Sequence, residues 1–135
     1  MSDTIQFELV SPEEKLVSEG VYLAEIPGDE GYFGVLKGHA SLVSSLKAGV
    51  VTLYKEKGAD ARKIFIAGGF ADVSAENCTV LAEEAIDVKN LNKDSLEQYL
   101  SDLNEDFGIA EEKHDKLRIK QKIEITKAKL FALAA

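Results

Sequence analysis

The period of the hydrophobic pattern changes near Asn90, and this change constrains the fold more than any other feature of the chain. Before this point, apolar and polar side chains alternate over short runs, as where Ile5, Phe7 and Leu9 are separated by polar residues. A period of two is typical of a strand with one buried face. After this point, apolar side chains recur at the spacing of one helix face, at Leu96, Tyr99, Leu100, Leu103 and Phe107. We therefore expect a β unit in residues 1–88 and a helical unit in residues 89–135.

Short strand candidates follow one another through the first unit. They are residues 16–26, 50–54, 63–67, 70–74 and 78–83, together with the run that begins at Ile5. Turn-forming residues separate these runs, and Gly68-Gly69 is expected to end one strand before the next begins. Many short strands with frequent turns favour an all-β sandwich or barrel.

The second unit is predicted to contain two helices, at residues 94–107 and 111–132. Asp94 precedes the first apolar residue and Glu97 follows three residues later, which resembles a capping box with Asp in the Ser/Thr role. Gly108 is expected to end the first helix. In the second helix, acidic side chains come early and most lysines come late, an order that suits the helix dipole.

The second helix carries apolar residues on two sides. At about 100° per residue, one stripe collects Ala110, Leu117, Ile125, Ala128 and Phe131, and the other collects Ile119, Ile123 and Leu130. A helix that packs on a single neighbour needs one stripe. Two stripes indicate either two neighbours at once, as for a helix wedged between the first helix and the sandwich, or different neighbours in different states.

Charge is distributed unevenly along the chain. The formal net charge is −8, which makes general binding to nucleic acid unfavourable. Residues 1–90 hold 15 acidic and 8 basic side chains, a net −7, whereas residues 113–129 hold seven basic and two acidic ones, a net +5. The basic residues of interest are Lys116, Arg118, Lys120, Lys122, Lys127 and Lys129. Such a run is usually a solvated helix face, and its density also suits an acidic partner.

Residues 26–40, with the sequence IPGDEGYFGVLKGHA, hold four of the ten glycines of the chain. Aromatic and aliphatic residues lie between these glycines, so the segment is expected to form a rigid surface of turns rather than a flexible linker. A phosphate-binding loop would continue with Lys and Ser/Thr into a helix, but His39 and Ala40 follow Gly38. A set of tight β-turns and a protein-docking edge remain as interpretations.

Few residues suit catalysis or metal binding. Cys78 is the sole cysteine and lies in an alternating run, so it is expected to be a small buried hydrophobe. His39 and His114 are the only histidines, and they form no zinc pattern with one cysteine. Asp29 and Glu30 could act with His39 in acid–base catalysis, but carboxylates beside a histidine are common on turns. No apolar run is long enough to span a membrane, and the first residues do not resemble a secretory signal.

An ordered set of short motifs resembles the epsilon subunit family of the bacterial-type rotary ATP synthase. The matching runs are VSPE at 10–13, PGDEGYFGV at 27–35, GHA at 38–40, LKAGVV at 46–51, GGF at 68–70, TVLAE at 79–83 and IEITK at 123–127. Each motif is short, but together they cover nearly the whole chain in order, which makes the set specific.

The resemblance implies an all-β sandwich of about ten strands followed by a C-terminal helical hairpin. It implies a non-catalytic rotor subunit in the central stalk of a proton-translocating ATP synthase, peripheral on the cytoplasmic face of the bacterial inner membrane. The implied partners are the gamma subunit, the polar loops of the c ring and, for an extended hairpin that restrains ATP hydrolysis, the alpha/beta catalytic head. A free-standing ligand- or protein-binding sandwich is the alternative, and it leaves the two-striped basic helix without a role.

The resemblance also assigns surfaces to partners, position by position. The expected c-ring interface comprises Glu30, Tyr32, Phe33 and His39, and the expected gamma interface comprises Ser11, Leu42 and Ser44. The basic residues of the last helix are expected to face the catalytic head. No catalytic or metal-binding residue is implied.

Some members of this family bind ATP through an Ile/Leu-Asp-x-x-Arg pattern where the sandwich meets the hairpin. The matching positions here begin at Leu91, with Asn92 in place of Asp and Ser95 in place of Arg. Loss of the arginine removes the bidentate phosphate donor that such a site would use. No cofactor is therefore expected.

Overall fold

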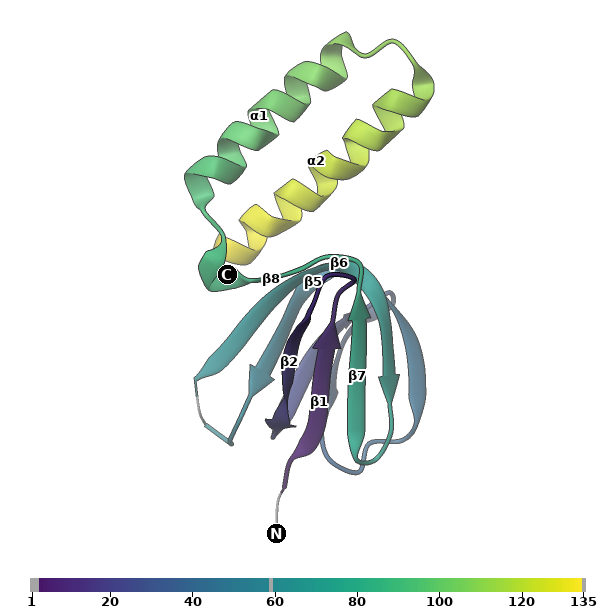
Figure 1. Ribbon diagram of the computed structural model, residues 1–135, viewed down its shortest axis with the longest axis vertical. Coiled ribbons are helices and arrows are strands. Elements are labelled where there is room, and N and C mark those ends of the chain that lie inside the picture. The colour runs from purple at the N-terminus through teal and green to yellow at the C-terminus, as the bar shows by residue number, and fades with distance from the viewer. Residues whose placement is uncertain (1–2, 59, 135) are drawn as a thin grey trace. The chain divides into compact units, whose positions relative to one another are not determined.

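The computed structural model describes residues 3–58 and 60–134, which divide after Asp87 into two compact units. All described strands precede this division and both described helices follow it (Figure 1). The all-β unit followed by two helices agrees with the fold class that the change of hydrophobic period predicts.

Eight strands form the described part of the β unit. They are β1 (Ile5–Val10), β2 (Lys15–Val21), β3 (Leu23–Gly28), β4 (Gly31–Val35), β5 (Leu42–Tyr54), β6 (Ala61–Val73), β7 (Asn77–Ala82) and β8 (Ala85–Asp87). Their order in the sheet is β2-β1-β7-β6-β5-β3-β4, and β8 pairs with β6 outside this path. The described pairs are antiparallel except for β1 and β7, which are parallel. The sheet curls over a shared interior, as a β-sandwich does (Figure 1).

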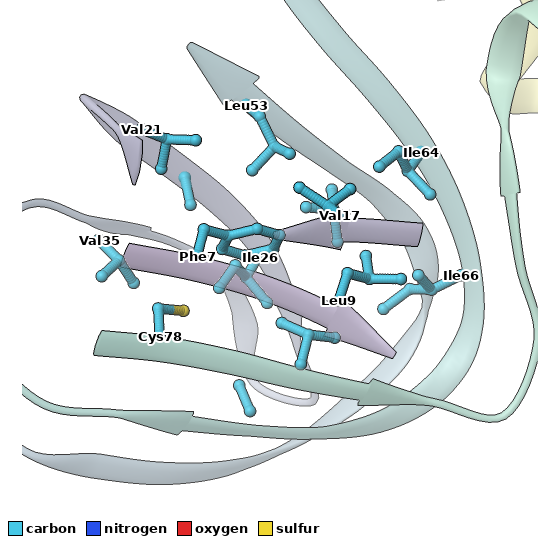
Figure 2. Packing of buried hydrophobic residues seen from close by; sticks show 14 of the residues in the cluster. Phe7, Leu9, Val17, Val21, Ile26, Val35, Leu53, Ile64, Ile66 and Cys78 are labelled. Carbon is cyan, nitrogen blue, oxygen red and sulfur yellow. The ribbon is translucent and has the colours of Figure 1, made fainter. Parts of the chain in front are cut away.

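Alternate side chains of the strands fill this interior. In β1, Ile5, Phe7 and Leu9 are fully buried while the residues between them are not. Figure 2 shows Phe7 and Leu9 meeting Val17 and Ile26 from other strands. Burial of each large apolar side chain stabilises the fold by roughly 1.5–3 kcal/mol. The alternating pattern read from the sequence therefore marks the core.

The strands β5 and β6, of 13 residues each, explain why eight strands are seen where about ten were expected. The prediction that Gly68-Gly69 ends a strand is wrong, because β6 continues through both glycines. Their φ angles of +118° and +143° bend the strand. Strand β6 pairs with β5 along its length but changes its other partner, from β8 at residues 64–66 to β7 at residues 69–73. One bent strand thus serves both layers of the sandwich.

The helical unit begins with the 3₁₀ turn η1 (Val88–Asn90) and contains α1 (Lys93–Ile109) and α2 (Lys113–Ala134). The two helices pack against each other as a hairpin (Figure 1). The first helix extends beyond the predicted residues 94–107, because Gly108 lies inside its last turn. The second helix starts and ends two residues later than the predicted 111–132. Glycine is tolerated in a terminal turn, so Gly108 was a weak stop signal.

The cap of α1 also differs from the prediction. Asn92, rather than Asp94, is the N-cap, and its side chain accepts a hydrogen bond from the Ser95 N–H at 2.9 Å. Asp94 lies in the first turn, where its carboxylate suits the positive end of the helix dipole. Asn and Asp are comparable N-caps, so the sequence offers two candidates two residues apart.

Candidate functional site

The glycine-rich segment 26–40 folds into the β3–β4 hairpin and the loop after it. Gly28 pairs with Gly31 at the tip, so Asp29 and Glu30 form a two-residue turn, and both of these acidic residues are exposed. The Asp29 N–H donates to the Ser45 carbonyl at 3.0 Å, which ties the turn to β5. The tip is therefore an ordered acidic edge, named here the acidic turn (residues 28–31).

Tyr32 and Phe33 hold this hairpin from opposite faces, because successive strand residues point to opposite sides. Phe33 packs against the core, and its ring lies so close to Gly28 that a Cβ there would be 3.0 Å away. Tyr32 lies beside Gly49 of β5, and its hydroxyl oxygen accepts a hydrogen bond from the Val50 N–H at 3.0 Å. Both aromatic side chains thus have structural contacts within the β unit.

A groove of about 530 Å³ lies between the acidic turn and the beginning of β5. Residues 28–33 and 42–45 line it. The groove brings together three residues expected at the c ring and two expected at gamma, namely Glu30, Tyr32, Phe33, Leu42 and Ser44. The two surfaces that the resemblance assigns to different partners therefore adjoin each other in the fold.

Two other predicted site residues do not line this groove. His39 lies in the loop after β4, where its backbone N–H donates to the Leu36 carbonyl at 3.1 Å and its Nδ1 is 2.6 Å from the Ala40 carbonyl oxygen. Ser11 lies in the turn between β1 and β2, where its N–H donates to the Glu14 carbonyl at 2.9 Å. Both residues take part in local hydrogen bonds that order their loops.

An apolar row crosses the outer face of the sheet. The strand register places Val10 beside Leu81, Leu81 beside Phe70, and Phe70 beside Ser45. Phe70 and Leu81 are 56% and 55% exposed, although their strands, β6 and β7, lie in the middle of the strand order and not at an edge. We call Val10, Leu81, Phe70 and Ser45 the outer row. Within this row, Phe70 and Leu81 form an adjacent pair of exposed apolar side chains, flanked by the partly buried Val10 and the polar Ser45.

Sequence reasoning did not single out Phe70 and Leu81. Both fall inside runs that match the family, at 68–70 and 79–83, and these matches are the sequence feature that could have pointed to them. Which face of each strand points outward depends on the register between distant strands, and one of these pairs is parallel. Alternation alone does not place the two side chains side by side.

In the helical unit, the two apolar stripes of α2 differ in exposure: one holds the buried Ile123 with the partly buried Ile119 and Leu130, and the other is open at two of its residues. Ile123 of α2 and Leu103 of α1 are buried. Leu117 and Phe131, from the other stripe, are 56% and 78% exposed. The open stripe leaves apolar surface on α2 that a neighbour can cover.

Most of the predicted basic residues of α2 reach solvent. Lys116, Arg118, Lys120, Lys122 and Lys127 are exposed, and Lys129 is partly buried. The Lys116 ammonium lies 5.6 Å from the centroid of the Phe107 ring, and an Arg118 Nη2 lies 3.5 Å from Asp115 Oδ1. Exposed ion pairs contribute roughly 0–1 kcal/mol, so such contacts do not fix the basic side chains in place.

Potential metal-ligand clusters, the single cysteine and the length of the helices are the features of the described residues that bear on metal, redox and membrane functions. Among them, no group of three or more His, Cys, Asp or Glu side chains is placed to hold a metal ion. Burial, followed by the nearby charge of Asp72, raises the pKa of the Cys78 thiol to about 12, so this thiol is a poor nucleophile at neutral pH. Neither helix, over the stretches that are described, is long and apolar enough to cross a membrane.

Comparison with known sequences finds a family and relatives of full length. The family described as ATP synthase, Delta/Epsilon chain, beta-sandwich domain, matches residues 4–88. An ATP synthase epsilon chain from Rhodospirillum centenum is 42% identical over 139 residues, covering 100% of this chain and 95% of the relative. That of Rhodospirillum rubrum is 39% identical over 132 residues, covering 98% of each chain. That of Paramagnetospirillum magneticum is 38% identical over 134 residues, covering 99% of this chain and 100% of the relative.

Two solved structures share the fold of both units. A chain in the Euglena gracilis mitochondrial ATP synthase, solved as OSCP/F1/c-ring, has a TM-score of 0.84 at 24% identity, covering 98% of this chain and 83% of that chain. A chain in the central stalk/c-ring structure of the Tetrahymena thermophila mitochondrial ATP synthase has a TM-score of 0.67 at 13% identity, covering 96% of each chain. At these identities the likeness concerns the fold.

Proposed function

The chain belongs to the ATP synthase epsilon family, whose members are non-catalytic subunits of that enzyme, and we propose that it joins two parts of the rotor. Family membership confirms the resemblance read from the motifs. In the proposal, the β unit binds the gamma subunit through one surface and the polar loops of the c ring through another. The observation that carries the proposal is the pair of exposed surfaces on the β unit, the acidic turn and the outer row, which meet at the start of β5.

The outer row supports the binding of gamma. Leu42 and Ser44, which the resemblance assigns to gamma, lie in β5 together with Ser45 of the outer row. Ser11 follows Val10, the other end of that row, in the sequence. Phe70 lies between these two ends, and exposed aromatic side chains are favoured near the centre of a protein interface. Leu42 and Ser44 pair with the buried Val73 and Ala71, so their side chains lie on the other face of β5 and adjoin the outer row only along the backbone. The exposed Phe70 and Leu81 therefore carry this part of the proposal.

The rim of the outer row is partly acidic. The row next to the outer row contains Glu8, Thr79, Asp72 and Val43, as the strand register shows. Asp72 is exposed, and the Glu8 carboxylate lies 3.1 Å from the Lys15 ammonium. An apolar strip beside carboxylates fits a gamma surface that presents apolar side chains next to lysine or arginine.

The acidic turn supports the binding of the c ring. Its carboxylates, on Asp29 and Glu30, are exposed, and the turn is tied to β5 by the hydrogen bond from Asp29 to Ser45. A pre-ordered turn loses little conformational freedom when it binds. The two carboxylates fit loops that offer basic side chains or N–H donors.

The helical unit supports a restraint on ATP hydrolysis. Residues of α1 include five acidic side chains and one lysine, whereas α2 includes seven basic and two acidic side chains. The packed hairpin therefore places helices of opposite net charge together. An acidic surface on the catalytic head would attract the exposed basic residues of α2 away from α1, and a hairpin with two such alternatives is a two-state element.

We infer a peripheral position on the cytoplasmic face of the bacterial inner membrane, held by the c ring. The three relatives described above come from bacteria. The net charge of −8 disfavours direct binding to an anionic lipid surface. Attachment through protein contacts is consistent with both observations.

Co-purification from detergent-solubilised membranes tests the proposal. The tagged chain should recover the gamma subunit and the c ring together. Phe70→Asp places an unpaired charge in the outer row and should lower gamma recovery at least about tenfold. Glu30→Lys should lower c-ring recovery and leave gamma recovery unchanged. Lys63→Asp, at an exposed position of β6 outside both surfaces, is the matched control and should leave both unchanged. Recovery of neither partner by the unaltered chain would refute the proposal and favour a free-standing binding module.

A further inference from the structure

The tip of the β3–β4 hairpin rests on a bulge in β5. Glu25 pairs with Thr52 and Gly28 pairs with Leu46, so two residues of β3 face five residues of β5 between these positions. The extra residues form a bulge, where ladder hydrogen bonds are interrupted. Inside it, the Val50 N–H donates to the Tyr32 hydroxyl at 3.0 Å instead of to a carbonyl of β3. A side chain from β4 thus satisfies a backbone donor of β5.

Gly49 makes room for this contact. A Cβ on Gly49 would lie 2.6 Å from the Tyr32 hydroxyl oxygen and 2.8 Å from the Pro27 Cβ. Both distances are shorter than real side-chain contacts, so any larger residue would lift the tyrosine or displace β3. The φ angle of Gly49 is not positive, so close approach alone, and not backbone conformation, requires glycine here.

Lys47 adds a contact to the same ring. Its ammonium lies 5.8 Å from the centroid of the Tyr32 ring, within the range of a cation–π interaction. Tyr32 is therefore held through its hydroxyl by Val50 and through its ring by Lys47. Its side chain is engaged within the β unit even though 54% of the residue is exposed.

We propose that Tyr32 is a positioning residue, which holds the acidic turn in the orientation that meets the c ring through its bond to Val50 and its seat on Gly49. This inference rests on the proposed function. Tyr32 directly follows the turn, and the Asp29 N–H bond to Ser45 holds the turn from within. Both bonds end on β5, so the turn is fixed to one strand at two points. A turn fixed in this way pays a smaller entropic cost on docking.

Amide hydrogen exchange of the full chain, followed by NMR, tests the contacts of Tyr32 with Val50 and Gly49 in the absence of any partner. Tyr32→Phe keeps the ring and removes the hydroxyl, so exchange at Val50 should become about tenfold faster while Val80 in the core is unchanged. Gly49→Ala should accelerate exchange at both Val50 and Asp29. Unchanged exchange at Val50 in both variants would overturn the inference.

Gly34→Ala is the matched control for Gly49→Ala. Gly34 is exposed in the same hairpin, and a Cβ there would meet only a Leu23 Cδ1 at 3.3 Å. This change should leave exchange at Val50 as in the unaltered chain. Acceleration at Val50 in this control as large as in Gly49→Ala would overturn the specific role of Gly49.

Binding to purified c rings tests the consequence for docking. Tyr32→Phe keeps the exposed ring that a partner would touch, so a direct-contact role for this ring predicts nearly full affinity in Tyr32→Phe. The positioning role predicts that Tyr32→Phe and Gly49→Ala each weaken binding about fivefold or more, and that Gly34→Ala does not. Full affinity in Tyr32→Phe would overturn the positioning role. Failure of the unaltered chain to bind would instead refute the proposed function. The exchange result would still show whether Val50 and Gly49 hold Tyr32 in place.

Discussion

Gly69 lies at the bend of β6 with a φ of +143°, and a Cβ there would collide with the Leu81 carbonyl oxygen. Gly69→Ala should therefore lower the free energy of unfolding of the β unit by about 2 kcal/mol or more. Urea unfolding followed by circular dichroism measures this change. Gly108→Ala is the control, because nothing lies within 4 Å of the added methyl, and it should stabilise α1 by roughly 0.5–1 kcal/mol. A Gly69→Ala protein as stable as the unaltered chain would contradict the described bend.

Cys78 offers a second test at the scale of one residue. Burial raises the pKa of its thiol from 9.0 to about 12, so the folded protein should react with an aromatic disulfide reagent at pH 8 at least about 100-fold more slowly than the protein in urea. Above pH 9 the unfolded state loses this proton before the folded state does. The contribution of Cys78 to stability should therefore be constant below about pH 9 and decrease as the pH rises toward about 12.

Cys78→Ala is the control for this pH dependence, because the variant should lack the decrease that the unaltered chain shows between these pH values. Rapid labelling of the folded protein at pH 8 would show that the thiol is accessible, and the described core would then be wrong at this position.

At the scale of elements, the sequence predicted what depends on local pattern. The alternation at Ile5, Phe7 and Leu9 marks β1, and the helical spacing around Leu103 marks α1. The continuation of β6 through Gly68-Gly69 was not predictable, because pairing with β5 along both halves outweighs the local preference of glycine for a turn. Long-range pairing therefore explains the difference in strand number.

The candidate surfaces were predictable only in part, for a related reason. Glu30 and its neighbours were found because the contiguous run at residues 27–35 resembles the family. The contact between Tyr32 and Val50 joins residues 18 positions apart, and the outer row joins four strands, so both depend on a register that local patterns do not encode. Phe70 consequently became a candidate only once its neighbours were known.

The basic face of α2 provides a functional prediction for a single element. Replacement of Lys116, Lys120 and Lys127 with Gln should raise ATP hydrolysis by the assembled enzyme severalfold. Each exposed contact contributes only roughly 0–1 kcal/mol, but several together can shift a two-state hairpin. High salt should reproduce part of the effect, because it screens the same contacts.

The matched control for this triple change is the same substitution at three lysines of the β unit, Lys55, Lys57 and Lys63, which should leave hydrolysis unchanged. Removal of residues 109–135 should raise hydrolysis at least as much as the triple change. Hydrolysis that is indifferent to both the triple change and this removal would mean that the helices do not restrain the enzyme.

At the scale of the whole molecule, the β unit should fold without the helices. Its main hydrophobic cluster consists only of residues from strands β1 to β7. Its last strand, β8, is held by an ion pair in which Arg62 Nε lies 3.1 Å from Asp87 Oδ2. A fragment that ends at Lys89 should therefore keep a β-rich circular dichroism spectrum and unfold cooperatively. Non-cooperative unfolding of this fragment would show that the core needs the helical unit.

The central claim for the whole molecule is that two surfaces of one β unit bind two different partners. Site-specific photo-crosslinking in the assembled enzyme tests this claim most directly, with a benzophenone side chain placed at position 70, 30 or 63 in separate proteins. The outer row at position 70 should yield a product with gamma, the acidic turn at position 30 a product with the c subunit, and the β6 position 63 neither product. A product with the c subunit from position 70 and with gamma from position 30, or background yields from both positions, would contradict the account.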